Sequence, residues 1–188
     1  MYNFIRMKNV NFIIFTAIIL ILLVGCKKKS DPPAASDSNN GFTRNGVFYS
    51  TPNGVYIHEG DSLFGFMFYS GSISFDHANQ CWVGKGNTTE ISELISHSVQ
   101  NHFPNGNYVF RNEGGTGFFD DAGTAINYSF DSDSGYMEYC VRGDLSIIPT
   151  GTRYEINYTF HNEDSTLVTG KFIGNLQDIT SWVTKKTH

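Results

Sequence analysis

Acidic side chains alternate with serines in the segment 131–135 (Asp-Ser-Asp-Ser-Gly), and calcium-binding loops begin with such alternating carboxylates. An EF-hand loop also needs glycine at its sixth position and glutamate at its twelfth. Here Gly135 is fifth and Arg142 is twelfth, so the segment does not match that motif. A looser oxygen-ligand site with Asp120 and Asp121 is the alternative, but acid-rich turns explain these residues more simply. We expect no metal site and no cofactor.

The histidines and glutamates form no recognisable catalytic set. His97 and His102 are five residues apart, so neither a helix nor a strand presents them well together. The chain has no His-Glu-x-x-His zinc motif and no Gly-x-Ser-x-Gly nucleophile motif. Glu90 and Glu93 are paired carboxylates of the kind that glycosidases use, although acids in an acidic domain are usually solvated. We expect a protein that is not an enzyme, with a hydrolase as the less favoured alternative.

Aromatic side chains are the candidates for ligand contact. Phe118 and Phe119 lie between two glycine-containing breaks, 114–117 and 120–123, from which they could project as an apolar contact point. Trp82 could stack on a sugar ring. The alternative is burial, because most aromatic residues of an all-β domain pack in its core. We take Phe118, Phe119 and Trp82 as the candidate ligand residues. Further residues that could stack on a sugar are Trp182, Tyr49 and Tyr69.

The elements that must position these residues are predicted to be β-strands. The segment 154–161 alternates apolar and polar residues, and Val168, Phe172 and Leu176 share one side of the segment that returns after a turn. Such period-two alternation is typical of strands with one buried and one solvated face. The same alternation occurs at Phe64, Phe66 and Phe68, and at Ile126, Tyr128 and Phe130.

Two further segments carry weaker signals. A Pro-Asn-Gly turn lies between the β-rich segments 46–50 and 55–59, which predicts a hairpin. In the segment 88–100, apolar residues such as Ile91 and Leu94 have helical spacing, whereas the neighbours on both sides are strands. We favour a strand for this segment and keep a short helix as the alternative.

The overall pattern predicts an all-β fold of about nine or ten strands, either an antiparallel β-sandwich or a partly closed β-barrel. These strands fall in residues 41–188, a length that suits one domain. From Gly41 onward the chain has 8 Lys and Arg against 16 Asp and Glu, a formal charge of −8 with neutral histidines. A negative domain without a basic patch is not expected to bind nucleic acid.

Residues 1–25 have the features of an export signal. Two basic residues precede an uncharged apolar run, 12–25, which is shorter than the roughly 20 residues that a transmembrane helix needs. The run ends Leu-Val-Gly-Cys at 23–26, which resembles the lipobox of bacterial lipoproteins. That resemblance implies cleavage between Gly25 and Cys26 and acylation of Cys26, which would anchor the protein in a membrane. An uncleaved anchor and a soluble secreted product are the alternatives.

Residues 26–40 are predicted to form a flexible tether, because Ser, Asp, Asn and Pro dominate its second half and cannot bury apolar surface. The lysines at 27–29 either contact anionic head groups or are solvated. Because position 27 is lysine rather than aspartate, the resemblance to lipoproteins implies an outer-membrane location, on the periplasmic side or at the cell surface.

Cys81 and Cys140 remain once Cys26 is assigned to the lipid. An exported domain folds where disulfides form, so these two cysteines are predicted to make one disulfide. Two buried free thiols are the alternative.

The segment 143–176 resembles the C-terminal part of small all-β lipoproteins of Bacteroidetes-type cell envelopes, through Tyr-Glu-Ile-Asn-Tyr and Val-Thr-Gly-Lys-Phe-Ile-Gly-Asn-Leu. The segment 103–108 is similar to a turn and strand in their middle. The resemblance implies fold and location but brings no activity and no site residues. We expect a non-enzymatic, lipid-anchored binding or assembly module of the cell envelope with a protein or glycan partner. The alternative is a glycan or small-ligand binder that uses a barrel mouth or an aromatic face.

Overall fold

The computed structural model describes residues 39–183, apart from positions 61, 80, 97–98, 101–102 and 113–114. Gly25, Cys26, the signal, most of the tether, His97 and His102 lie outside the described residues. No helix of the described chain is long and apolar enough to cross a membrane. The elements are β1 (Gly41–Arg44), β2 (Val47–Ser50), β3 (Asn53–Glu59), β4 (Leu63–Tyr69), β5 (Ile73–Asp76), β6 (Cys81–Ile95), β7 (Val99–Gln100), β8 (Phe103–Pro104), β9 (Gly106–Phe110), β10 (Phe118–Phe119), β11 (Asp121–Ser129), β12 (Met137–Thr150), β13 (Arg153–Asn162), β14 (Leu167–Gly174), β15 (Gln177–Asp178) and α2 (Thr180–Val183).

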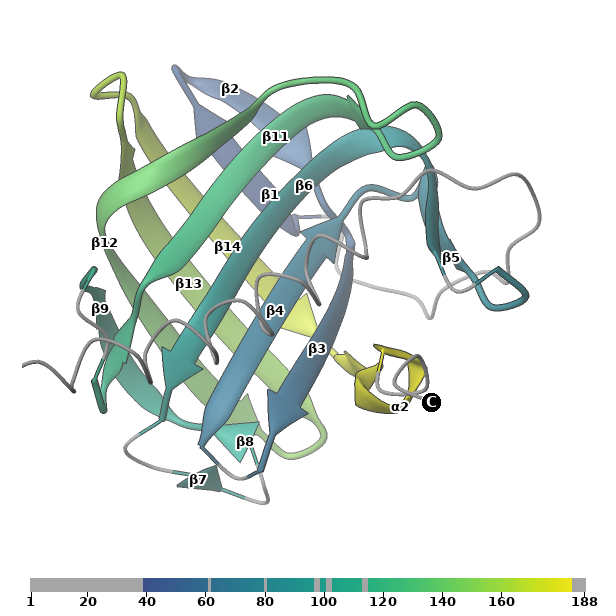
Figure 1. Cartoon of the computed structure of the whole chain (residues 1–188). Coiled ribbons are helices and arrows are strands. Elements are labelled where there is room, and N and C mark those ends of the chain that lie inside the picture. Colours follow the sequence, from purple (N-terminus) through teal and green to yellow (C-terminus); the bar gives the residue numbers. More distant parts are fainter. Residues whose placement is uncertain are drawn as a thin grey trace, which may run out of the picture.

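One sheet of 13 strands curls into a partial ring (Figure 1). Its order is β15-β3-β4-β6-β10-β9-β12-β13-β14-β1-β2, with β11 paired to both β6 and β12 and β5 paired to β6. Most neighbours are antiparallel, but β9 with β10 and β3 with β15 are parallel. Strands β7 and β8 form a separate pair. The prediction of an all-β fold is confirmed.

The C-terminal segment draws the two sides of the ring together. Strand β15 follows β14 after two residues and pairs with β3, so that Gln177 lies opposite Val55. A Cβ atom added to Gly54 of β3 would lie 2.8 Å from the ring of Phe172 on β14. Glycine at position 54 therefore allows β3 to pack closely against β14.

The interior of the ring is an aromatic core. Strands place every second side chain on one face, so the inward residues of neighbouring strands meet. The ring of Tyr158 stacks on Phe68, with ring centroids 6.0 Å apart, and on Phe160 at 4.9 Å. The Tyr158 hydroxyl bonds to the hydroxyl of Thr89 at 3.0 Å. The largest fully buried side chains of this interior core are Phe42, Phe64, Phe68, Phe103, Tyr108, Phe119, Phe160 and Phe172.

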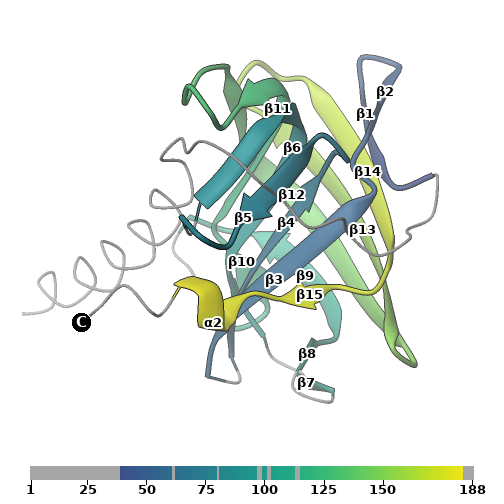
Figure 2. The same cartoon turned by 90° about the vertical axis from the view of Figure 1, so that its right-hand side faces the viewer.

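A second core, the outer core, covers the opposite face of β3, β4 and β6. Strand β5 and helix α2 lie on this side of the sheet, away from β13 and β14 (Figures 1 and 2). Trp82 packs edge-on against Tyr69 and Phe75, with ring centroids 4.9 and 5.4 Å apart. Because β4 has a core on each face, every residue of β4 after the first is buried. The buried members of the outer core are Val55, Ile57, Met67, Tyr69, Ile73, Phe75, Trp82, Ala125, Tyr128, Phe130 and Ile179.

A β-bulge explains the helical spacing of Ile91 and Leu94. The register between β4 and β6 shifts by one residue opposite Gly65, and Glu93 in the bulge has a φ of 53°. The extra residue lets both Ile91 and Leu94 point into the interior core although they are three residues apart. The prediction of a strand is confirmed for 88–95, and a helix there is excluded.

A second bulge, in β11, corrects the prediction for 126–130. The register between β11 and β6 shifts between Ala125 and Tyr128, and Asn127 has a φ of 54°. Ile126 packs against the interior core, whereas Tyr128 and Phe130 belong to the outer core. The prediction that these three share one face is wrong, because the inserted residue changes the face to which the following side chains point.

The hairpin predicted from 154–161 and the returning segment is confirmed, and the hairpin predicted from 46–50 and 55–59 is wrong. Strands β13 and β14 pair as an antiparallel hairpin along the whole of β14. Strand β2 instead pairs with β1, and β3 pairs with β4. Asn53 and Gly54 of the predicted turn belong to β3. The Pro-Asn-Gly sequence favours a turn only locally. The pairing of β3 with β4 along the full length of both strands overrides that preference.

The predicted disulfide between Cys81 and Cys140 is not formed. Cys140 is a buried free thiol whose Sγ donates to the Arg142 carbonyl at 3.2 Å, and burial raises its pKa to about 11. Cys140 belongs to the interior core, whereas the start of β6, with Cys81, pairs with β5, which lies on the outer side of the sheet (Figure 1).

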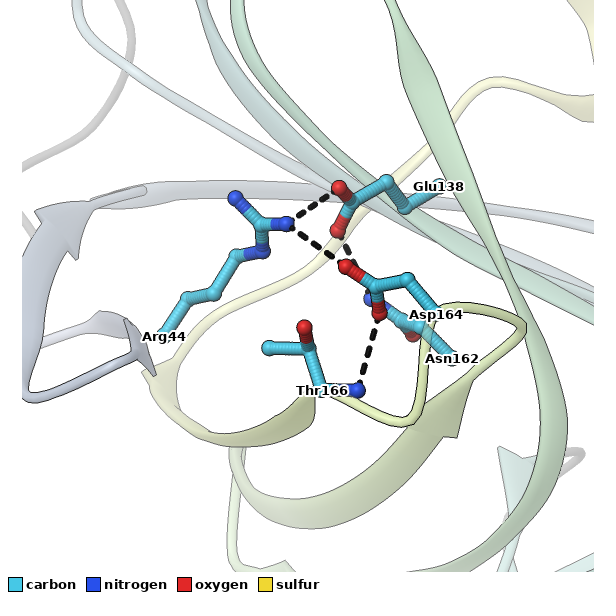
Figure 3. A network of polar contacts seen from close by, with 5 residues as sticks. All are labelled: Arg44, Glu138, Asn162, Asp164 and Thr166. Carbon is cyan, nitrogen blue, oxygen red and sulfur yellow. Dashed lines mark hydrogen bonds and ion pairs between the residues drawn. The ribbon is translucent and has the colours of Figure 1, made fainter.

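A network of ion pairs joins β1 to β12 and to the turn after β13 (Figure 3). Arg44 pairs with Glu138 and, at 3.2 Å, with Asp164. The Asn162 side chain donates to Glu138 at 2.9 Å, and the Thr166 amide donates to Asp164 at 2.8 Å. The side chains of Arg44 and Glu138 are only 22% and 14% exposed. Solvent therefore screens this pair less than an ordinary surface ion pair.

Replacing Gly170 by alanine is expected to lower the free energy of unfolding by about 3 kcal/mol. The added Cβ would overlap the ring of Tyr158, which lies across this glycine. Urea unfolding of the purified protein measures the effect. Gly71→Ala is the matched control, because a Cβ at Gly71 meets nothing within 4 Å. Equal stability of the two variants would contradict the close packing of Tyr158 on β14.

The Arg44→Met variant is expected to lose about 2 kcal/mol of unfolding free energy, because the largely buried Glu138 carboxylate loses its cation. Arg153→Met removes an exposed arginine and is expected to stay within about 0.5 kcal/mol of the original protein. The double variant Arg44→Met, Glu138→Gln should recover part of the loss in the same unfolding experiment. A loss no larger than that of Arg153→Met would show that the network does not stabilise the fold.

Candidate functional site

The outer core contains an apolar pocket, called the outer pocket below. Its lining comes from β3, β4 and β6 and from Ile179, the residue before α2. Figure 2 shows β3, β4 and α2 on the same side of the molecule. Its volume is about 40 Å³, which is room for roughly three water molecules. The apolar lining includes Val55, Ile57, Met67, Trp82 and Ile179, and the polar members are Glu90 and Ser92.

The missing side chain of Gly65 makes room for the outer pocket. Gly65 lies on β4 between residues whose side chains face the interior core, and its own position faces outward with Met67. A Cβ atom at Gly65 would lie 3.1 Å from the Ile57 side chain, which is closer than ordinary packing allows. The bulge in β6 lies opposite the same glycine and sets the position of Ser92. One glycine and one bulge therefore shape the floor of the pocket.

Trp82 contributes to the wall of the outer pocket and carries an unused hydrogen-bond donor. Its side chain is fully buried, and its indole Nε1–H has no hydrogen-bond partner. A buried N–H group without a partner costs about 1–3 kcal/mol. An acceptor atom on a bound ligand would remove that cost.

Four carboxyl groups, called the acidic row below, lie along β6 and the start of β11. Glu90 lines the outer pocket, and Asp121 accepts a hydrogen bond at 3.1 Å from Ser92, which also lines the pocket. The carboxyl groups of Glu93 and Asp120 lie close enough for each to affect the pKa of the other. The ladder between β6 and β11 brings these residues together, because it sets Asp121 opposite Ser92.

Desolvation and mutual repulsion favour the protonated state of the acidic row. Desolvation, with the charge of Asp121 as a smaller cause, raises the pKa of Glu90 to about 7. Desolvation, followed by the nearby Asp120 carboxyl group, raises the pKa of Glu93 to about 7. Desolvation is also the main cause that raises the pKa of Asp120 and of Asp121. Every charge that acts on these four groups is another carboxylate, so no cation of the described chain balances the row.

The predicted ligand residues lie mostly in the cores. Phe118 and Phe119 form β10 rather than a loop, because this segment pairs with β9 and β6. Phe119 is fully buried, and Phe118 lies beneath the Arg111 guanidinium, whose carbon is 4.2 Å from the ring centre. The expectation that this pair projects into solvent is wrong. Trp82 alone of the three lines the outer pocket, as a buried wall and not as an exposed platform.

The other aromatic candidates also pack against neighbours. Tyr69 is buried, Tyr49 stacks on Phe42 with ring centroids 5.2 Å apart, and Trp182 stacks on Phe75 at 4.7 Å. These contacts leave no row of exposed rings for a sugar among the candidates that the sequence offers.

The acids of the segment 131–135 make structural hydrogen bonds. Asp133 accepts one from the Tyr128 hydroxyl, and Asp131 accepts one from the Gly84 amide at 3.2 Å. In the part of the chain that the structure describes, no group of three or more His, Cys, Asp or Glu side chains is arranged to hold a metal ion.

A shallow hollow of about 460 Å³ crosses β9, β12, β13 and β14. Small polar side chains such as Asn107, Asp144 and Asn157 line it. Its two tyrosines, Tyr108 and Tyr158, belong to the interior core and present no ring to the outside. The hollow therefore lacks the aromatic platform that a sugar site commonly uses, and the outer pocket is the stronger candidate.

Comparison with protein families, with curated proteins and with solved structures finds no match for this chain. The site is therefore interpreted from its own geometry.

Sequence reasoning named every member of the acidic row but did not bring the four together. It treated Glu90 and Glu93 as one pair and Asp120 and Asp121 as another, because only the ladder between β6 and β11 connects them. It also missed Gly65, although a glycine within an aromatic strand often marks a bulge or a close approach.

The acidic row predicts that stability falls as pH rises from about 4.5 to about 7. Glu90 and Glu93 have folded-state pKa values of about 7, above their ordinary value of 4.5. The folded state therefore binds more protons in this range, and their stabilising effect disappears as pH passes the folded-state pKa. The double variant Glu90→Gln, Glu93→Gln should be more stable than the original protein at pH 8 by about 1 kcal/mol, after allowance for solvent screening.

Urea unfolding between pH 4.5 and pH 8 measures this effect. Glu163→Gln, at an exposed turn position, is the control and should keep the pH dependence of the original protein. A double variant with the same pH slope as the control would show that the two glutamates titrate normally.

Proposed function

We propose that this protein is a lipid-anchored binding module of the bacterial cell envelope, without enzymatic activity, whose domain takes its ligand in the outer pocket. The observation that carries the binding part is an apolar pocket lined in part by Trp82, whose indole N–H is buried and has no partner in the protein. Ligand sites are typically apolar hollows with a few convergent polar groups. Glu90 and Ser92 supply such groups at the same pocket.

The anchoring part rests on the sequence before the domain. Leu-Val-Gly-Cys at 23–26 follows an uncharged apolar run, and the tether that follows contains little that could pack. An acylated Cys26 with more than one acyl chain would hold the protein stably at a membrane. The tether would let the outer pocket face either the periplasm or the cell exterior.

The geometry of the carboxyl groups favours binding over glycoside hydrolysis. Glycosidases hold their two carboxyl groups about 5–5.5 Å apart or farther, so that a sugar or a water fits between them. Glu93 and Asp120 line neither the outer pocket nor the hollow across β9, β12, β13 and β14, so neither space would hold a sugar between them. Of the described residues that line the outer pocket with Glu90, none is a histidine that could activate Ser92.

The anchor is tested by the intact mass of the protein purified from the envelope of a bacterium that expresses it. The expected mass lacks residues 1–25 and includes acyl chains, and Cys26→Ala should remove the acyl mass and leave the protein in the soluble fraction. Cys140→Ala is the control and should keep the acyl mass, because Cys140 is a buried free thiol.

Two masses would contradict the anchor. One is a chain without acyl groups that keeps residues 1–25. The other is a chain without acyl groups that gains the mass of two hydrogens on reduction, when the Cys26→Ala variant does not. The Cys26 sulfur would then be part of a disulfide and could not carry the lipid.

A further inference from the structure

We propose that the outer pocket binds a small organic ammonium ion. Its apolar part, of about three carbons, fills the pocket, its ammonium group pairs with Glu90 and Asp121, and a neighbouring acceptor receives the Trp82 indole N–H. This inference rests on the proposed function and names the ligand class.

The size of the pocket limits the apolar part of the ligand. A volume of about 40 Å³ holds roughly three water-sized groups, so an isopropyl group fits and a large ring does not. Val55, Ile57 and Met67 provide the apolar contacts. Glu90 is partly exposed and Asp121 is exposed, so the rest of the ligand can extend outward past these two side chains.

The acidic row determines the charge of the ligand. Glu90 lies in the lining, and Ser92 of the lining holds Asp121 by a hydrogen bond at 3.1 Å. Each carboxylate of the row repels its neighbours, and no cation of the described chain acts on them. An ammonium group at this edge would relieve the repulsion, whereas a carboxylate ligand would add to it.

The Trp82 indole requires a hydrogen-bond acceptor on the ligand. Its Nε1–H is a donor only, it is fully buried, and it has no partner in the protein. An ammonium group cannot accept a hydrogen bond, so the ligand needs an oxygen acceptor besides its amine. An α-amino amide combines the three features, with an apolar side chain, an ammonium group and a carbonyl oxygen.

Three probes that differ by one group each test the proposal on the full chain as purified. Valinamide carries the isopropyl, ammonium and carbonyl groups, 3-methylbutanamide lacks the ammonium group, and isobutylamine lacks the carbonyl. Titrations at constant ionic strength follow Trp82 fluorescence in the variant Trp182→Phe, because the chain has 2 tryptophans. Calorimetry on the original protein provides the second readout.

Valinamide is expected to bind at millimolar concentration or below, and each of the other two probes should bind about tenfold more weakly. Glu90→Gln should weaken the binding of valinamide about tenfold and leave the binding of 3-methylbutanamide unchanged. The substitution keeps the shape of the side chain and removes its charge. Glu163→Gln lies at an exposed turn outside the pocket and should bind like the original protein.

Two results would overturn the inference and are distinguishable. If 3-methylbutanamide binds as well as valinamide, the pocket does not select a cation, but the proposed function as a binding module stands. If none of the three probes binds at millimolar concentration, the pocket is not a site for this ligand class, and the binding part of the proposed function fails with it.

Discussion

The structure depends on the aromatic packing inside the ring, and above all on Tyr158. Its ring lies across Gly170 of the neighbouring strand, stacks on Phe68 and Phe160, and bonds through its hydroxyl to Thr89. One side chain therefore joins β4, β6, β13 and β14. Because such rings fill the interior densely, a hollow that could admit a ligand has to be sought on the outer face of the sheet.

The outer face offers such a hollow because β4 is covered on both sides. Strand β5 and helix α2 build a second core over it, and Gly65 leaves that core incompletely filled. The bulge opposite Gly65 inserts Glu93 into β6 and thereby brings it against Asp120. One local irregularity thus accounts for both the apolar pocket and the crowding of the carboxyl groups beside it. Bulges commonly redirect side chains at functional sites in this way.

Prediction from the sequence succeeded where the alternation of apolar and polar residues in a segment matched the alternation of buried and exposed side chains. The alternation in β13 and β14 held because their inward residues meet one continuous core. It failed at Ile126, Tyr128 and Phe130, where a bulge changes the face, and at Cys81 and Cys140, because Cys140 is a free thiol in the interior core. The sequence analysis chose Trp82 because its ring could stack on a sugar. In the structure the ring is buried, and the feature that points to a ligand is its unpartnered N–H group.

By itself, the sequence determined the all-β class, the strand at 88–95 and the last hairpin, because these follow from turn residues and from the alternation of neighbouring side chains. It also contains the segment 23–26, whose resemblance to a lipobox depends only on neighbouring residues and not on the fold. Tertiary structure alone decided the partial ring, the two cores and the meeting of Glu90, Glu93, Asp120 and Asp121. These features depend on which strands pair and in which register, and a shift of one residue there would turn every side chain to the other face.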